Sequence, residues 1–199
     1  MDVHDWGAYQ KKRQGSTPRP LLAEALNFIP NHNAALDLGG GGLTDAQYLL
    51  DQNLLKVDVV DITPPLNNTI QRNPRFEYHQ VRFEEYRFPI DRYSLVSAQY
   101  SLPFCSPAFF NQVWSGIQAS LIPEGIFAGQ LFGPNDDWSA IPEMTFLNKA
   151  SIQSLIAGFV EIKLVEREFT ESIVRRKHWH YFDLIMKKPK STKIPASQT

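Results

Sequence analysis

Four consecutive glycines, Gly39 to Gly42, stand directly after a short apolar segment, and a carboxylate flanks them on each side. Asp37 lies two residues before the glycines, and Asp61 follows Gly39 by 22 residues, at the end of a second apolar segment. Glycine lets a ligand approach the backbone closely and allows positive φ angles in a tight turn. An acidic residue about 20 positions after such a loop can accept hydrogen bonds from ribose hydroxyls. The spacing therefore predicts a site for a cofactor that carries a ribose.

The residues around the glycines also bear on the class of cofactor. Dinucleotide-binding enzymes use a G-x-G-x-x-G pattern that faces a pyrophosphate. Here Thr44 stands at the sixth position, so that pattern is incomplete. A buried carboxylate at Asp37 would repel a pyrophosphate. It suits a positively charged cofactor, or it orders the loop by accepting backbone hydrogen bonds.

Alternating helices and strands must position these residues. Apolar patterning predicts seven strands, over residues 34–38, 57–62, 76–81, 93–98, 126–132, 160–169 and 178–187. It predicts helices over residues 20–28, 43–50 and 149–157, and another that begins at Ser106-Pro107. Such alternation implies a parallel sheet with right-handed crossovers, whose ligands bind at the carboxyl ends of the strands. The last two strands have no helix between them, so we expect an antiparallel pair at one edge.

Length and composition exclude several classes of protein. A chain of 199 residues fits one domain, and a net charge of -1 predicts no nucleic-acid surface. The single cysteine, Cys105, excludes a disulfide within the chain and a cysteine-based zinc cluster. No segment approaches the roughly 18 apolar residues that a membrane span needs. The first residues lack the pattern of a signal peptide, so we expect a cytoplasmic protein without a membrane partner.

Several segments together resemble the motifs of a known family. Residues 35–42 resemble the first motif of class I S-adenosylmethionine-dependent methyltransferases, and residues 59–62 resemble their second motif. Residues 123–127 resemble the turn before the fifth strand of that family. Residues 100–104 and 177–180 are similar to segments of small bacterial members related to the tellurite-resistance methyltransferases.

This resemblance implies an α/β fold: a Rossmann-like three-layer sandwich with a seven-stranded, mostly parallel sheet and an antiparallel strand at the C-terminal end. It covers residues 20–187, the methyltransferase domain. Residues 1–19 then form an N-terminal arm, and residues 188–199 a flexible tail. The implied cofactor is S-adenosyl-L-methionine.

The family's residue roles transfer position by position. Gly39 and Gly41 match positions near the methionine part of the cofactor, Asp61 matches the ribose ligand, and Ile62 matches the residue on one adenine face. Gln99 and Tyr100 match positions beside the methyl group. The cofactor-binding residues predicted in this way are Asp37, Leu38, Gly39, Gly40, Gly41, Asp61, Ile62, Arg82, Phe83 and Gln99.

Two positions depart from the family pattern. Arg82-Phe83 falls where the family often has an aspartate and a small residue near the adenine amino group. A backbone contact or Glu84 is the candidate replacement for that aspartate. Leu43 stands at the third glycine of the first motif, at a position that faces the following helix.

Methyl transfer requires mainly that donor and acceptor be positioned and water excluded, and a base only if the acceptor must lose a proton. Tyr100, His178 and His180 are the predicted catalytic residues. The two histidines share one side of a strand, so they could form a base pair, bind a metal or simply pack. No carboxylate is placed beside them, and we predict no metal site.

We therefore expect a methyltransferase that acts on a small molecule, as a monomer or homodimer, without nucleic acid. No Asn-Pro-Pro-Tyr type motif follows the fourth strand, which disfavours methylation of a base or glutamine amide nitrogen. Two alternatives remain: an NAD-dependent oxidoreductase on a similar sheet, and a non-catalytic binding module in which the Arg82 and Leu43 departures mark a lost site.

Overall fold

The computed structural model describes residue 7 and residues 15–65, 70–171 and 176–190, and within them the predicted fold class is confirmed. Seven strands form one sheet, in the order β3-β2-β1-β4-β5-β7-β6. Strands β1 to β5 pair in parallel, and β7 is antiparallel to both β5 and β6. The strands are β1 (Ala34–Leu38), β2 (Lys56–Asp61), β3 (Phe76–Gln80), β4 (Tyr93–Ala98), β5 (Leu121–Phe132), β6 (Val160–Glu171) and β7 (Lys177–Lys187).

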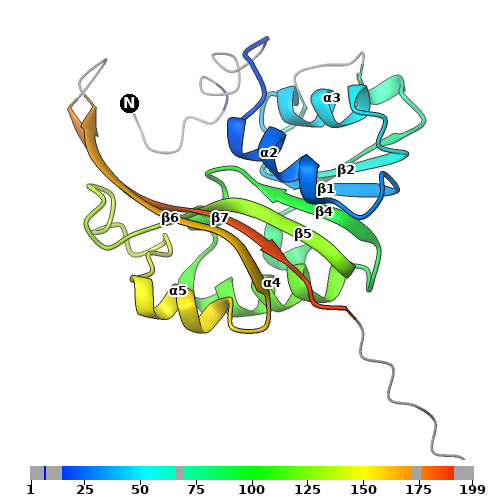
Figure 1. The fold of residues 1–199 in the computed structure, drawn as a ribbon. Helices are drawn as coiled ribbons and strands as arrows, with labels where there is room; N and C mark the ends of the chain where they lie inside the picture. The colour runs from blue at the N-terminus through cyan, green and yellow to red at the C-terminus, as the bar shows by residue number, and fades with distance from the viewer. Residues whose placement is uncertain (1–6, 8–14, 66–69, 172–175, 191–199) are drawn as a thin grey trace, which may run out of the picture.

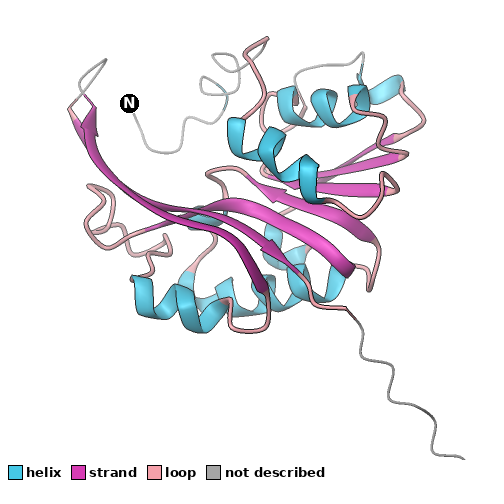
Figure 2. Ribbon diagram, viewed as in Figure 1, coloured by secondary structure: helices cyan, strands magenta, loops and turns pink. Residues whose placement is uncertain are grey.

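Helices cover both faces of this sheet (Figures 1 and 2). One layer holds α2 (Pro20–Ala25) and α3 (Thr44–Asp51), and the opposite layer holds α4 (Pro107–Ser120) and α5 (Lys149–Leu155). Alternate residues of each strand pack against the two layers, as the period of a strand requires. In β1, Ala35 joins the core under α2 and α3, whereas Leu36 joins the core under α4 and α5. We call these sides the α2–α3 face and the α4–α5 face.

Helix α4 begins where the sequence predicted. The hydroxyl of Ser106 accepts a hydrogen bond from the backbone N–H of Ala108 at 3.4 Å, and Pro107 occupies the first helical position. The proline restricts φ and removes a backbone donor that would have no partner in the helix. The buried side of the helix packs on the sheet, with Trp114 edge-on to Phe127 at 4.9 Å between ring centroids.

Strand β5 differs from the prediction. It begins at Leu121 rather than at residue 126, and the predicted turn over residues 123–125 is an irregularity inside the strand. Glu124 there has a φ of 65°, and its N–H donates to the carbonyl of Lys188 at 3.0 Å. The hydrogen bond to Lys188, which is distant in the chain, therefore helps to hold residues 123–125 in the strand, although their residue types favour a turn.

Parts of the predicted arm and tail lie outside the described residues, namely 1–6, 8–14 and 191–199. At the arm's end, the N–H of Arg19 donates to Oδ1 of Asp45 at 2.9 Å. At the other end, the N–H of Lys188 donates to the carbonyl of Gly125 at 2.8 Å. Arg19 and Lys188, which flank the predicted domain, are therefore both hydrogen-bonded to it.

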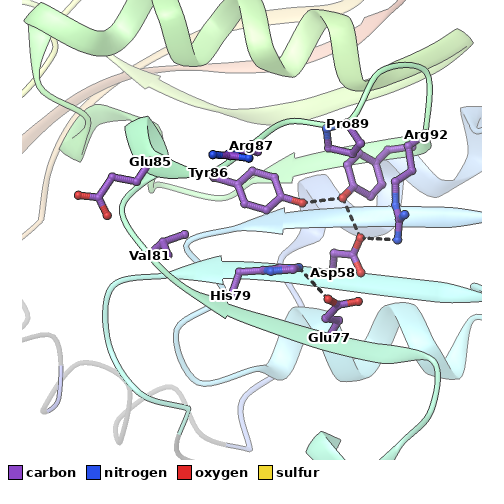
Figure 3. Close-up of a pocket in the computed structure, with 10 residues that line it drawn as sticks. Asp58, Glu77, His79, Val81, Glu85, Tyr86, Arg87, Pro89 and Arg92 are labelled. Carbon is purple, nitrogen blue, oxygen red and sulfur yellow. Dashed lines mark hydrogen bonds and ion pairs between the residues drawn. The ribbon is translucent and has the colours of Figure 1, made fainter.

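The connections on either side of β3 hold short 3-10 turns in their described residues: η2 (Ile70–Arg72) before it and η3 (Phe83–Glu85) after it. The α4–α5 face over β2 and β3 consequently carries polar side chains around a cavity (Figure 3). None of the helices in the described part of the chain is long and apolar enough to cross a bilayer.

Candidate functional site

The glycine loop begins where β1 ends, at the carboxyl edge of the sheet. Gly39 and Gly41 have φ angles of 79° and 49°, which residues with a side chain rarely adopt. The N–H of Gly39 donates to the carbonyl of Val60 at 2.7 Å, so the loop is tied to the end of β2. A Cβ on Gly39 would lie 2.3 Å from the Cβ of Ser101. The positive φ angles therefore favour glycine at positions 39 and 41, and the close packing requires it at position 39.

Gly40 is required by packing alone. A Cβ at this position would lie 2.3 Å from Cγ1 of Val59 and 3.2 Å from Oδ2 of Asp37. Real Cβ atoms do not come so close to a neighbouring methyl group, so either the loop or Val59 would have to shift.

Asp61 lies beside the loop. Its Oδ2 accepts a hydrogen bond of 2.9 Å from the N–H of Gly41. Its Oδ1 accepts from the N–H and the hydroxyl of Thr63, at 2.9 and 2.7 Å. These bonds fix the carboxylate at the carboxyl end of β2, and the side chain remains partly exposed. A carboxylate oxygen can accept more than one hydrogen bond, so both oxygens can still receive a hydroxyl.

Asp37 is the buried carboxyl group of the loop. It is 2% exposed, and its Oδ2 has no hydrogen-bond partner among the described residues. Burial raises its pKa well above the ordinary range, and the negative charges of Asp45 and Asp61 raise it further. A positively charged ligand would offset this cost, so the loop is electrostatically prepared for a cation.

Ile62 directly follows β2, and Phe83 is the first residue of η3. Ile62 is 48% exposed, an unusual state for an isoleucine, and the Phe83 ring reaches within 3.6 Å of the Cβ position on Gly39. Arg82 instead pairs with Glu84 at 2.6 Å, with 57% of its side chain exposed. The two apolar side chains are therefore available to a flat ring, while the arginine charge is neutralised by its neighbour.

Leu43 replaces the third glycine of the motif without opening the loop. It keeps the left-handed backbone of a glycine position, with a φ of 62°, and precedes α3 as its N-cap. Its side chain is 1% exposed and packs in the core of the α2–α3 face. Burial of the leucine compensates for a backbone conformation that costs roughly 1–2 kcal/mol in a residue with a side chain.

Gln99 and Tyr100 follow β4. Nε2 of Gln99 donates to the carbonyl of Ala128 at 3.1 Å, so this side chain turns toward β5. Its Oε1 is buried and has no hydrogen-bond partner among the described residues. Tyr100 has a φ of 59°, and its N–H donates to Oε1 of Gln130 at 3.0 Å. Strain of this kind in a residue other than glycine is typical of functional sites.

A buried polar network supports Tyr100 from β5 and β7. Gln130, 2% exposed, donates from Nε2 to Oδ1 of Asp183 at 3.0 Å. The guanidinium of Arg167 donates from Nε to Oδ2 of Asp183, also at 3.0 Å. The sequence analysis missed this network. Its signal is a polar residue at an inward position of each of two apolar strands, namely Gln130 and Asp183.

Tyr100 also lies among aromatic and cationic groups. Its ring meets that of Tyr181 edge-on at 5.3 Å between centroids, and the guanidinium carbon of Arg19 lies 4.8 Å from its ring centroid. Burial raises the pKa of the Tyr100 phenol. The phenol is therefore neutral at physiological pH and can donate a hydrogen bond, but it is a poor base.

A second aromatic group lies where β5 ends and β7 begins. The ammonium of Lys177 sits between two indoles, 3.8 Å from the Trp138 ring centroid and 3.9 Å from that of Trp179. It also forms an ion pair with the buried Asp136. Burial lowers the pKa of Lys177, although Asp136 opposes this shift. Trp138 further packs on Phe104 at 6.0 Å between centroids, so these rings form one aromatic wall.

The two predicted catalytic histidines are engaged in the strand pair β6–β7. Nδ1 of His180 accepts from the N–H of Asn135 at 3.1 Å, so Nε2 carries the proton and donates to Glu166, also at 3.1 Å. His178 contacts Glu168 through Nε2 and Thr170 through Nδ1, each at 3.0 Å.

These histidine rings also lie away from the glycine loop. They share a side of β7 with Phe182, which packs on the α4–α5 face, and β4 and β5 separate β7 from β1. Their catalytic role therefore stays a prediction that the geometry does not favour. The structure does bring Asp61 and Phe83 to the glycine loop, and Ser101, which follows Tyr100, donates to the carbonyl of Leu38 at the end of β1.

Solved structures with a similar backbone come from several organisms. The 1,6-didemethyltoxoflavin-N1-methyltransferase of Burkholderia thailandensis has a TM-score of 0.67 and 19% identity, over 92% of this chain and 85% of that one. The N-methyltransferase NodS of Bradyrhizobium japonicum has a TM-score of 0.65 and 10% identity, over 96% and 100%. A SAM-dependent methyltransferase of Methanosarcina mazei has a TM-score of 0.67 and 15% identity, over 87% and 99%.

The chain has the class I methyltransferase fold. The match extends over nearly the whole chain and includes the antiparallel β7 beside β5. No protein-family model and no curated protein matches the sequence. At such low identities, the likeness to the class I methyltransferases concerns the fold alone.

Proposed function

We propose that this chain is an S-adenosylmethionine-dependent methyltransferase that acts on a small molecule. The observation that carries the proposal is the pairing of Gly41 with Asp61 beside the buried Asp37, whose Oδ2 has no hydrogen-bond partner among the described residues. A fixed carboxylate for a ribose and an uncompensated negative charge suit a cofactor that combines a nucleoside with a positive sulfonium and ammonium. The fold supports the same conclusion, because the neighbours named above are methyltransferases and one of them holds S-adenosylhomocysteine.

In this proposal, the parts of the cofactor follow the carboxyl edge of the sheet. The methionine part lies over Leu38 and the glycine loop near Asp37, the ribose hydroxyls bind Asp61, and the adenine lies between Ile62 and Phe83. The exposed isoleucine and the nearby phenylalanine ring supply apolar surface for both faces of a base. Arg82 flanks this slot through its pair with Glu84, and Gln99 supports the strand end without a direct contact.

The acceptor would bind beyond the methyl group, beside Tyr100. Tyr181 and the aromatic wall of Trp138 and Phe104 offer flat apolar surface, and Arg19 adds a positive charge over the Tyr100 ring. Such a wall fits a small, flat acceptor. The Burkholderia thailandensis enzyme, a 1,6-didemethyltoxoflavin-N1-methyltransferase, gives a precedent for a small-molecule acceptor on this fold.

The sulfonium cofactor, when bound, supplies an activated methyl group, and the chain's residues position the acceptor and exclude water. The neutral phenol of Tyr100 can orient the acceptor as a hydrogen-bond donor. Catalytic roles for His178 and His180, membership of the tellurite-resistance type, a cytoplasmic location and a monomeric or homodimeric state stay predictions.

The strand order disfavours the dinucleotide alternative. Dinucleotide-binding sheets of the Rossmann type are mostly parallel, with the usual strand order 3-2-1-4-5-6. Here β7 enters antiparallel between β5 and β6. The buried carboxyl group of Asp37, whose Oδ2 has no hydrogen-bond partner in the described part of the chain, also disfavours a pyrophosphate near the loop. The alternative of a binding module without catalysis is left for experiment.

Thermal-shift and calorimetric titrations test the proposal directly. We expect S-adenosylhomocysteine and S-adenosylmethionine to bind with a stoichiometry of one and to raise the melting temperature, and NAD to do neither. Stabilisation by NAD alone would overturn the proposal. Mass spectrometry of freshly purified protein checks independently for a nucleoside retained from the cell. Binding of the cofactor without methyl transfer to any acceptor in an extract would favour the binding module.

A further inference from the structure

A polar cavity of about 470 Å³ lies on the α4–α5 face, over β2 and β3 (Figure 3). Asp58, Glu77 and His79 face it from adjacent strands. The parallel register pairs Asp58 with Glu77 and Val60 with His79, so residues distant in sequence converge here. Within the described residues, this is the one group of three His, Cys, Asp or Glu side chains whose ligand atoms all lie within 4.8 Å of one another.

Two of the three side chains hold a buried atom that lacks a hydrogen bond. Asp58 is 2% exposed, and its Oδ1 has no hydrogen-bond partner in the described parts of the chain. Nε2 of His79 is also a buried atom without a hydrogen-bond partner there. A carboxylate oxygen and an imidazole nitrogen buried without a partner are costly, and such atoms are rare in folded proteins. Their unmet capacity points into the cavity and therefore to a ligand.

In each of the two carboxylates, one oxygen is bound by neighbouring side chains. Oδ2 of Asp58 accepts a hydrogen bond from the Tyr93 hydroxyl at 2.7 Å and pairs with Arg92 at 3.0 Å. Oε2 of Glu77 pairs with Lys56 at 2.8 Å, which lowers the pKa of this carboxyl group. Each carboxylate thus has one oxygen that is bound by a neighbouring side chain and one oxygen that faces the cavity. Metal sites commonly orient their ligands through such outer partners.

His79 is oriented as well. Its ring packs on Tyr86 with 5.2 Å between centroids, and its Nε2 lies 3.8 Å from Oε1 of Glu77. That distance is too long for a hydrogen bond. It suits two atoms that bind one ion, because two ligand atoms lie farther from each other than either lies from the metal. One imidazole nitrogen and two carboxylate oxygens form a donor set that suits a divalent transition metal.

We propose that Asp58, Glu77 and His79 bind a divalent transition-metal ion such as Zn²⁺, with water completing the coordination. The ion would link β2 to β3, whose described flanking segments hold only the short turns η2 and η3. Asp58 and Asp61 point to opposite faces of β2, because an odd number of positions separates them. The site is therefore separate from the proposed cofactor site, and its role is structural. It reverses our expectation from sequence that the chain has no metal site.

Lys56 is the competitor for this site. Its ammonium lies 3.9 Å from Oδ1 of Asp58, and together with Arg92 it balances the two carboxylates. An entering ion must displace the ammonium from Asp58.

Calorimetry with Zn²⁺ on the tag-free full chain at pH 7.5 tests the site, with Co²⁺ absorption bands as a second probe of coordination. We expect one ion per chain, a higher melting temperature, and at least a tenfold loss of affinity in His79→Gln and in Glu77→Gln. His178→Gln is the matched control, since His178 also contacts a glutamate but belongs to no such group of three ligands within the described residues. It should bind Zn²⁺ like the wild type.

Equal Zn²⁺ binding by the wild type, His79→Gln and Glu77→Gln would overturn the proposal, and so would no binding by the wild type at millimolar Zn²⁺. Circular dichroism of each variant checks that it is folded. Binding of S-adenosylhomocysteine is measured in parallel on the same proteins. Because the two sites are separate, failure of one proposal leaves the other standing.

Discussion

The backbone N–H of Gly41 donates a hydrogen bond of 2.9 Å to Oδ2 of Asp61. The two residues are 20 positions apart in the chain and meet because β1 and β2 are parallel neighbours. A second bond, from the N–H of Gly39 to the carbonyl of Val60 at 2.7 Å, fastens the same loop to the same strand end. The loop and the carboxylate therefore form one hydrogen-bonded unit.

Replacing Asp61 by alanine should weaken binding of S-adenosylhomocysteine about 10- to 100-fold. The change removes the ribose acceptor and the partner of the Gly41 N–H, a loss of roughly 1–3 kcal/mol. Isothermal titration calorimetry measures it. Asp51→Ala, at the exposed end of α3, serves as the control and should bind like the wild type. An unchanged affinity in Asp61→Ala would mean that the ribose does not bind there.

Replacing Gly40 by alanine should destabilise the fold by about 1–3 kcal/mol, because the new Cβ would lie 2.3 Å from Cγ1 of Val59. Adding Val59→Ala to this variant removes the methyl group that the new Cβ would meet. The double variant should therefore lose less stability than the sum of the two single changes. Urea unfolding of all four proteins measures this coupling, and Gly158→Ala, whose Cβ would meet nothing within 4 Å, is the tolerated control.

Asp37 should make stability depend on pH. Its pKa is raised in the fold by burial, so the native state holds more protons than the unfolded chain between the ordinary value, about 4, and the raised one. The free energy of unfolding should therefore fall as pH rises through that window. Asp37→Asn should remove this fall and raise stability at pH 8 by about 1–3 kcal/mol, while weakening cofactor binding.

Chemical unfolding of the wild type and of Asp37→Asn at pH 5 and pH 8 measures this effect. Asp51→Asn is the control, since that side chain is exposed and should leave the pH dependence as it is. A gain in stability for Asp37→Asn that is equal at both pH values would contradict the argument, because it would not depend on the ionisation of Asp37.

Gln130 should matter for stability more than an exposed glutamine does. Gln130→Leu leaves the N–H of Tyr100 and Oδ1 of Asp183 without their partner, which should cost about 1–3 kcal/mol. Gln112→Leu removes one 3.3 Å bond on the surface of α4 and should change stability by less than about 0.5 kcal/mol. Thermal unfolding compares the two. Similar effects in both variants would show that the buried network contributes little.

The strands and the loop could be predicted because their signals are local. β1 and β4 match the predicted ranges, since continuous apolar runs bounded by polar residues or glycine fix a buried strand. Gly39 to Gly41, with Asp37 and Asp61, could be found by spacing alone, since chain geometry sets how far one strand end lies from the next. The early start of β5 could not, because contacts distant in the chain, of Leu121 with Tyr93 and of Glu124 with Lys188, hold residues 121–125 in the strand.

The sequence by itself thus determined the order of elements, the sheet class and the glycine site, all of which rest on periodicity and short-range spacing. Tertiary structure alone decided which polar residues meet. Strand register pairs Gln130 with Asp183 and brings Asp58, Glu77 and His79 to one cavity, while it engages His178 and His180 with glutamates of β6. Register between strands that are distant in the chain depends on the packing of the whole sheet, so the residues of one strand do not by themselves determine which polar partners it meets.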